Sequence, residues 1–204
     1  MQKSALKNWL TVSNISTVLL LVFAIAMFVN PNIKVAVIKS LMKIGFFQVG
    51  IPSKNKLQEI EPLNEKVLSE IIFKNESGEL VNLSQLKGKV IFLNFWATWC
   101  PPCIAEMPGI NKLKQEYAEN NNIIFLMIDT DGDFNKSLDF MRKSAYQLPV
   151  FVLASQIPPV IFKNSLPTTL IVDKRGKMVL HHEGSADYNS REMRAFIKNL
   201  LAAK

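Results

Sequence analysis

Two cysteines set two residues apart constrain this chain more than any other feature of its sequence. Cys100 and Cys103 are its only cysteines. They follow a short apolar run at 90–95 (VIFLNF) and open a segment at about 101–119 whose apolar residues recur at helical spacing. A continuous apolar run of that length is typical of a strand buried on both faces. The cysteines therefore stand where a buried strand ends and a helix begins.

That location favours a reactive thiolate, because unpaired N–H groups and the helix dipole at a helix N-terminus stabilise an anion. Pro101 and Pro102 are tolerated there, since the N–H groups they lack would be unpaired in the first turn anyway. The spacing brings the two sulfurs within reach of a disulfide, which needs Cα atoms ~4.4–6.8 Å apart. We expect Cys100 to be the outer nucleophile and Cys103 the inner resolving thiol.

Other uses of the cysteines fit less well. A disulfide scaffold would have more cysteines at wider spacing, and a structural zinc site would usually have a second pair or nearby histidines. We therefore predict no metal site. Two cysteines that merely pack in a helix are disfavoured by the prolines between them and the tryptophan before them.

The net charge of +7 comes almost wholly from the N-terminal part of the chain. Residues 1–54 carry six lysines and no acidic residue, which leaves 18 basic and 17 acidic residues in the rest. Lysines that flank apolar sequence suit an anionic membrane surface better than nucleic acid. No basic stripe interleaved with aromatic residues follows, so we predict no nucleic-acid partner.

An uncharged, apolar segment covers residues 9–29, and its 21 residues would span roughly 30 Å as a helix. The run 24–26 (AIA) resembles a signal-peptide cleavage site, but apolar residues continue past it to Val29. A buried core helix would rarely lack charged residues over this length. We expect residues 1–31 to form an uncleaved transmembrane anchor with a short tail. Lysines on both sides leave its orientation open.

Residues 32–66 are predicted to form a juxtamembrane helix and a linker. The part at 33–49 is apolar with scattered lysines, and two interpretations stay open: a short helix lying on the membrane surface, or a spacer that covers the following domain. The part at 50–66 is polar, contains two prolines and has the composition of a linker.

The third predicted domain covers residues 67–204, where strand and helix patterns alternate. The elements expected besides those around the cysteines are a hairpin across 75–78, a strand at 123–128, a helix near 135–145, a strand at 150–153, a hairpin of 168–172 with 177–182, and a final helix at about 190–202. This order predicts an α/β fold with a central mixed sheet and helices on both faces. The acidic turn at 129–133 lacks the glutamate of a calcium loop, and we interpret it as a solvated turn.

The segment at 94–108 (NFWATWCPPCIAEMP) resembles the active-site segment of the TlpA/ResA group of membrane-anchored thioredoxin-like proteins. The similarity extends over roughly 67–204. It implies a thioredoxin-like fold and a thiol–disulfide oxidoreductase without a further cofactor, acting as a reductase of protein disulfides. It also implies a catalytic domain on the periplasmic or extracytoplasmic side of a bacterial inner membrane. The implied partner is a membrane thiol–disulfide electron donor of the DsbD/CcdA type.

The resemblance also marks residues for substrate binding. Thioredoxin-like folds keep a cis-proline facing the cysteines, and Pro167 fits that position. The backbone of Leu166 would then be exposed to an incoming peptide, which could add as a strand. Trp99, Pro101 and Pro102 complete the predicted substrate-binding set.

Glu106 is the third predicted catalytic residue. It lies three residues after Cys103 on the same helical face, where members of the group often carry an acid, and it would accept or return the proton of Cys103. An ordinary first-turn acid, favoured by the helix dipole, is the alternative. Asn94 stands where thioredoxins have a buried aspartate, and it cannot titrate. Pro108, inside the helix, predicts a kink.

Three other functions compete with that of a reductase. A peroxiredoxin would have a threonine three residues before its reactive cysteine, whereas Thr98 lies two before Cys100. A Cu(I)-binding module could use both thiolates with His181 or His182, but these alternate on a strand and only one could point inward. A net disulfide oxidase is chemically allowed, because direction depends on reduction potential and on the partner that resets the pair.

Overall fold

The computed structural model describes residues 12–52 and 65–203, with side chains from residue 15 onward. The helices are α2 (Val12–Val29), α3 (Pro31–Lys43), α5 (Glu65–Glu70), the 3-10 helix η1 (Leu83–Leu86), α6 (Pro101–Glu116), α7 (Phe134–Lys143) and α8 (Arg191–Ala202). The strands are β1 (Ile72–Asn75), β2 (Leu80–Asn82), β3 (Val90–Trp96), β4 (Ile123–Asp129), β5 (Val150–Leu153), β6 (Thr168–Val172) and β7 (Met178–Glu183). Most of the predicted linker, and the start of the predicted anchor at 1–11, lie outside the described residues.

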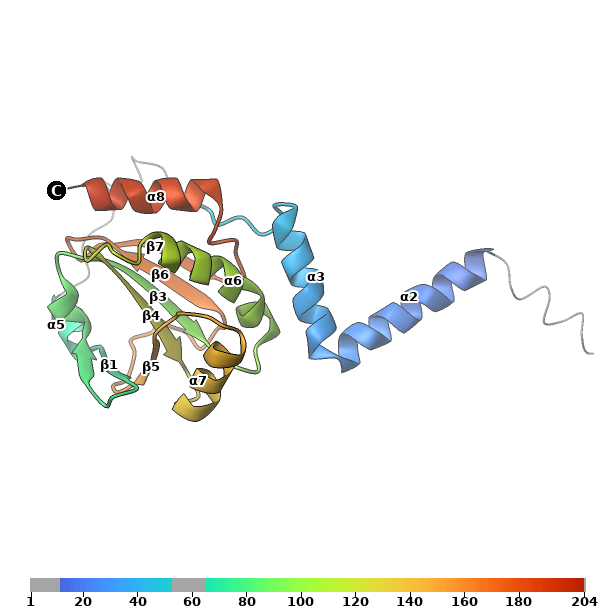
Figure 1. Cartoon of the computed structure of the whole chain (residues 1–204), viewed down its shortest axis with the longest axis horizontal. Coiled ribbons are helices and arrows are strands. Elements are labelled where there is room, and N and C mark those ends of the chain that lie inside the picture. The colour runs from blue at the N-terminus through green and yellow to red at the C-terminus, as the bar shows by residue number, and fades with distance from the viewer. Residues whose placement is uncertain (1–11, 53–64, 204) are drawn as a thin grey trace, which may run out of the picture.

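The seven strands form one mixed sheet in the order β2-β1-β5-β4-β3-β6-β7 (Figure 1). The strand β3 pairs with β4 in parallel and with β6 antiparallel, so it has neighbours on both edges. All of its residues are buried, as its apolar run predicts. The structure therefore confirms a mixed sheet with the cysteines directly after its central strand.

Alternate side chains of β3 face two separate cores. Val90, Phe92 and Trp96 join the core on the side covered by α6 and α8. Ile91, Leu93 and Phe95 join the other, which α5 and η1 help to close. The period-2 alternation of a strand produces this division. Asn94 shares the register of Phe92 and Trp96, and so faces α6.

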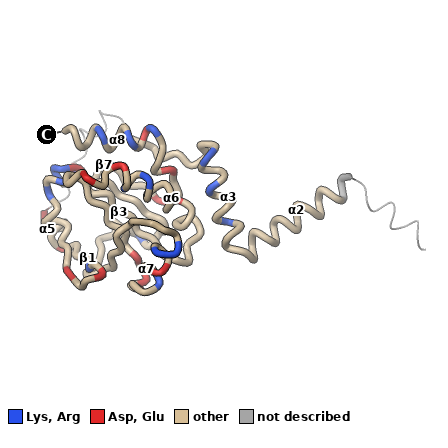
Figure 2. Tube along the Cα trace, in the orientation of Figure 1, with Lys and Arg blue, Asp and Glu red and all other residues tan. Residues whose placement is uncertain are grey.

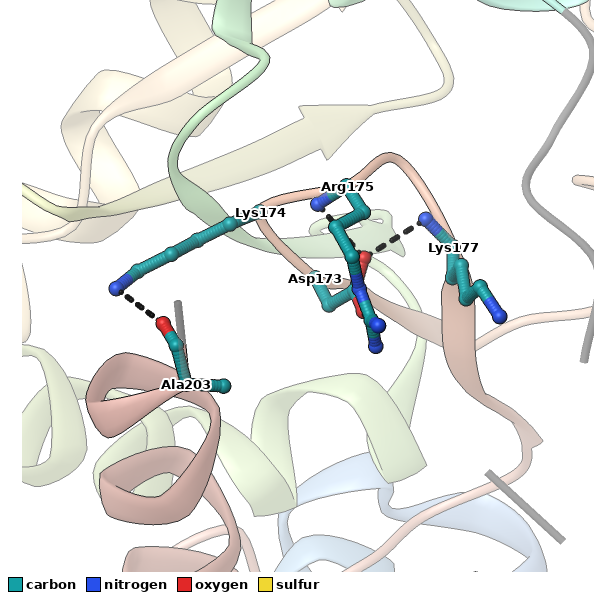
Figure 3. A network of polar contacts seen from close by, with 5 residues as sticks. All are labelled: Asp173, Lys174, Arg175, Lys177 and Ala203. Atoms are coloured by element: carbon teal, nitrogen blue, oxygen red, sulfur yellow. Dashed lines mark hydrogen bonds and ion pairs between the residues drawn. The ribbon is translucent and has the colours of Figure 1, made fainter. Parts of the chain in front are cut away.

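The helices around the sheet end close to the predicted limits. The helix α6 ends at Glu116, before the predicted limit of 119, because Tyr117 already has C-cap geometry. Pro108 lies inside α6 without ending it, and the kink expected there stays a prediction. The β6–β7 turn contacts the end of α8 through Lys174, whose Nζ donates to the carbonyl oxygen of Ala203 at 2.9 Å (Figure 3). The same Nζ donates to the carbonyl oxygen of Leu201 at 2.6 Å.

The turn itself is organised by Asp173. Its Oδ1 accepts hydrogen bonds from the backbone N–H groups of Arg175 and Lys177, both at 2.9 Å, and its Oδ2 is paired with the Arg175 guanidinium at 3.0 Å (Figure 3). The neighbouring Lys174 places its ammonium group at the last carbonyls of α8, where a positive charge is electrostatically favourable. The hydrogen bonds of Lys174 thus connect the β6–β7 hairpin to α8.

The helix α3 packs against α6. A small cluster joins Val35 and Met42 of α3 to Ala105 of α6. Farther along the chain, the Phe47 carbonyl accepts a hydrogen bond from Asp187 N at 2.9 Å, and Val49 is buried in the core beneath α6. These contacts agree with the second interpretation of 33–49, in which the segment covers the following domain. The domain boundary at residue 67 stays a prediction.

The helix α2 extends away from the domain and carries no charged residue, whereas the charged residues of α3 are all lysines (Figure 2). Within the described residues, no helix by itself has the length and apolar composition needed to cross a bilayer. The pair Ile15–Val29 and Pro31–Lys43, bent by 107° at the break between them, meets that requirement together. The transmembrane helix predicted for 1–31 is not confirmed by this result.

Candidate active site

Cys100 and Cys103 form a disulfide at the start of α6, with their Cα atoms 5.3 Å apart. Cys100 is the N-cap residue, and its Sγ accepts a hydrogen bond from the backbone N–H of Cys103 at 3.3 Å. Pro101 and Pro102 fill the first turn and are half-buried. The exposed fraction is 3% for Cys100 and 0% for Cys103, and the assignment of Cys100 as the nucleophile stays a prediction.

The side chain directly before the cysteines is open to solvent. Trp99 is 65% exposed, and its Nε1 donates a 2.7 Å hydrogen bond to Asp131 Oδ2. Because Asp131 lies in the turn after β4, this bond fixes the indole relative to the sheet. No sequence signal predicted it, since the two residues are 32 apart.

The Leu166–Pro167 peptide bond is cis, as the resemblance implied. The residue after Pro167 begins β6 and pairs with Phe95 near the end of β3. Pro167 therefore lies at the same end of the sheet as the cysteines. Its carbonyl accepts a hydrogen bond from Gly184 N at 2.8 Å, and Leu166 is half-buried. The predicted substrate-binding residues are thus gathered at one end of the sheet.

A buried polar cluster lies between the sheet and α6, one helical turn past Cys103. Asn94 Nδ2 donates to Glu106 Oε1 at 2.7 Å and to Thr169 Oγ1 at 2.8 Å. Glu106 Oε2 accepts from the backbone N–H of Ala186 at 3.3 Å. Glu106 is 1% exposed, and α6 has no acidic residue in its first turn. The alternative of an ordinary first-turn acid therefore does not describe its surroundings.

Burial raises the pKa of Glu106 well above the usual carboxyl range, while the hydrogen bonds from Asn94 and Ala186 lower it in part. Burial likewise raises the pKa of Tyr188 well above its ordinary value, with the nearby charge of Glu106 adding to the shift. A carboxyl that keeps its proton more readily than usual, one helical turn from a dithiol, has the properties of a proton acceptor and donor. Its catalytic role stays a prediction.

Sequence reasoning missed most of this cluster. The inward direction of Asn94 follows from the alternation of β3, because it is two residues from both Phe92 and Trp96. The Thr169 hydroxyl and the Ala186 N–H lie 75 and 80 residues from their partners. No local pattern in the sequence connects them.

The two histidines lie on β7, where His181 pairs with Leu170 and His182 with Thr169. Partial burial lowers the pKa of His181. Across residues 12–52 and 65–203, the structure contains no group of three or more histidine, cysteine or acidic side chains arranged to hold a metal ion.

Comparison with known proteins places these features among thiol oxidoreductases. The Redoxin family model matches residues 53–195. The thiol-disulfide oxidoreductase ResA of Bacillus cereus is 32% identical over 139 residues, which cover 67% of this chain and 77% of the relative. The thioredoxin-like protein YneN of Bacillus subtilis is 28% identical over 155 residues, covering 76% and 91%.

Solved structures show the same fold. A thiol:disulfide interchange protein DsbE from Chlorobium tepidum superposes with a TM-score of 0.58 at 22% identity, covering 71% of this chain and all of the other. A thiol-disulfide oxidoreductase from Bacteroides vulgatus gives a TM-score of 0.53 at 25% identity, covering 67% and 99%. The predicted thioredoxin-like α/β fold is confirmed.

Proposed function

The chain belongs to the Redoxin family and is a thiol–disulfide oxidoreductase, and we propose that it reduces disulfides of extracytoplasmic proteins while anchored to a bacterial membrane. The observation that carries the proposal is the Cys100–Cys103 disulfide at the N-terminus of α6, in which Cys100 is 3% exposed and Cys103 is fully buried. This asymmetry gives the two thiols different tasks.

In the reducing direction, the Cys100 thiolate attacks one sulfur of a substrate disulfide. A bond forms between Cys100 and that sulfur, the substrate disulfide breaks, and the other substrate sulfur leaves as a thiolate. Cys103, once deprotonated, attacks Cys100, forms the internal disulfide and releases the second substrate thiolate. Two electrons have then passed to the substrate, and the product is the oxidised pair seen in the structure.

Glu106 is the proposed acceptor of the Cys103 proton. Residues three apart on a helix are neighbours, so the Glu106 carboxyl and the Cys103 thiol share one side of α6. When Cys103 loses its proton, the Glu106 carboxylate takes it up and becomes a neutral acid, which its buried site favours. In the return direction the acid gives the proton back.

Trp99, Pro101, Pro102, Leu166 and Pro167 form the proposed substrate-binding rim. Its support is the exposure of Trp99 and the position of Pro167 at the cysteine end of the sheet. An extended peptide would pair with the backbone beside Leu166 and present its disulfide to Cys100.

The proposed anchor is α2 with the uncharged residues before it. Its 18 described residues would be about 27 Å long at ~1.5 Å per residue, and its apolar side chains are open, with Phe28 84% exposed. Retention of the full chain in membranes after alkaline extraction would support the anchor, and release into the supernatant would oppose it. An electron donor of the DsbD/CcdA type, embedded in the same membrane, is the proposed source of reducing equivalents.

The test of direction is the reduction potential of the pair, measured by equilibrating the full chain in detergent with thiol buffers. A value near or below about −270 mV supports a reductase, whereas one near about −120 mV makes the protein a disulfide donor. The Cys103→Ser variant tests the order of attack, because it should accumulate the mixed disulfide on Cys100. Cys100→Ser is the matched control and should trap none.

A further inference from the structure

A cavity of about 200 Å³ lies between α3 and α6 and is partly open to solvent. Lys39, Met42 and Lys43 of α3 form its outer wall. Ala105 and Glu106 of α6 contribute to its inner wall. The loop between β7 and α8 closes a third side. Glu106, the residue that carries the buried carboxyl, therefore lines the same cavity as Lys39 and Met42 of α3.

Glu106 is otherwise enclosed. Its Oε1 is held by Asn94 of β3 and its Oε2 by the N–H of Ala186, in the loop after β7. Its exposed fraction of 1% leaves no broad contact with solvent. A carboxyl that takes up a proton in each cycle must also lose it, which needs a path for water or hydronium.

We propose that this cavity is the route by which Glu106 exchanges protons with solvent, and that Met42 and Lys39 are positioning residues that set how open the route is. The inference rests on the proposed role of Glu106. After Cys103 has attacked Cys100, the neutral Glu106 acid transfers its proton to water in the cavity, and the carboxylate is restored. No electrons move in this step.

The side of the cavity formed by α3 is packed against α6. Met42 is 8% exposed and contacts the cluster that includes Ala105, the residue directly before Glu106. Because α3 follows directly on α2, the element next to the proposed anchor forms part of the surroundings of the catalytic acid. Movement of α3 would change the access of solvent to Glu106.

The charged and titratable groups around Glu106 come from three elements. Lys39 and Lys43 of α3, Lys112 of α6 and Asp187 of the loop before α8 line the same cavity, and Tyr188 of that loop interacts with the Glu106 charge. Cys103 lies one helical turn before Glu106 on α6. The strands β3 and β6 contribute the uncharged Asn94 and Thr169. Variants that test the route should therefore change the shape of the cavity and leave Lys112 and Asp187 in place.

The test compares Lys39→Trp with Lys34→Trp in the full chain in detergent. Lys39 lines the cavity, so the indole should obstruct it. Lys34 belongs to the same helix but lies over the Phe28 ring, 5.7 Å from its centroid, and is not a lining residue. Carbodiimide labelling of Glu106, followed by peptide mass spectrometry, measures access without reference to activity. Labelling of the exposed Glu116, which lies on α6 like Glu106, corrects for differences in the activity of the reagent.

We expect several-fold slower labelling of Glu106 in Lys39→Trp, wild-type labelling in Lys34→Trp, and faster labelling in Met42→Ser, which widens the cavity. Attack by Cys103 should slow in Lys39→Trp, while alkylation of Cys100 in the reduced enzyme keeps its rate. Equal labelling in the two tryptophan variants would overturn the route, whether or not Met42→Ser folds. If Glu106→Gln leaves the pH profile of the resolving step unchanged, the proposed role of Glu106 fails instead, so the two failures are distinguishable.

Discussion

The side-chain amide of Asn94 donates a 2.7 Å hydrogen bond to the carboxylate of Glu106, and both residues are buried. The strand before the disulfide and the helix after it are thus joined by a polar bond behind Cys103. A neutral amide in this place supports the carboxylate without competing for its proton.

Replacing Asn94 with aspartate should raise the apparent pKa of this site further. Two carboxyls within hydrogen-bond distance cannot both ionise readily, so the pair would hold one proton to higher pH. The pH profile of the Cys103-dependent step should move upward. Thr169→Val is the control, since it removes the other acceptor of the Asn94 amide without adding a titrating group. A profile unchanged in Asn94→Asp would contradict the proposed coupling.

The burial of Glu106 should make the folded protein less stable as the pH rises. The folded-state pKa is raised above the ordinary value of 4.5, so the folded protein binds the proton more tightly than the unfolded chain. The associated stability is present below pH 4.5 and is lost as pH rises through the folded pKa. Glu106→Gln should remove this slope in urea unfolding of the oxidised protein. Glu116→Gln, on the surface of the same helix, should keep it.

The hydrogen bond between Trp99 and Asp131 should affect peptide substrates more than small disulfides. Trp99→Phe removes the N–H donor and keeps a smaller aromatic ring that is free to move, so the KM for a peptide disulfide should rise with little change in kcat. Trp99→Ala also removes the apolar contact and should raise the KM further. Reduction of a small aromatic disulfide serves as the comparison. A fall in kcat alone would argue against a role in substrate binding.

Val49 should contribute to the stability of the catalytic domain although it precedes the predicted linker. It is 9% exposed within the core beneath α6. Val49→Ala removes two buried methyl groups, at about 0.8 kcal/mol each before any cavity effect, so the free energy of unfolding should fall by about 1.5–3 kcal/mol. Gln48→Ala, at the exposed neighbouring position, is the control. Equal stability of both variants would show that the segment does not belong to the folded unit.

The elements around the disulfide were predictable because their signals are local. An apolar run marks β3, and the spacing of Ile104, Met107 and Ile110 marks α6. The cis bond at Pro167 was expected only from the resemblance to known proteins. The positions of residues near the cysteines therefore follow from the sequence. The contacts of Thr169 in β6 and of Ala186 in the loop before α8 do not.

The position of 33–49 shows a limit of another kind. An apolar helix face with scattered lysines has the same composition whether its partner is lipid or protein. What decides is the complementary surface, here Ala105 and its neighbours on α6, and no pattern within 33–49 describes that surface. The polar contacts of Glu106 were hidden for a similar reason, because they depend on which loop lies over α6.

The attachment of α3 to α6 also changes what the following segment can do. Residues 31–49 meet the domain before the chain reaches 53–64, so lengthening or shortening 53–64 leaves the distance from α2 to the disulfide unchanged. If α2 is the membrane anchor, as proposed, the distance of the reactive sulfur from the membrane is set by packed helices and not by the length of 53–64. An anchored protein of this kind would act only on partners whose own disulfides lie at that distance from the membrane.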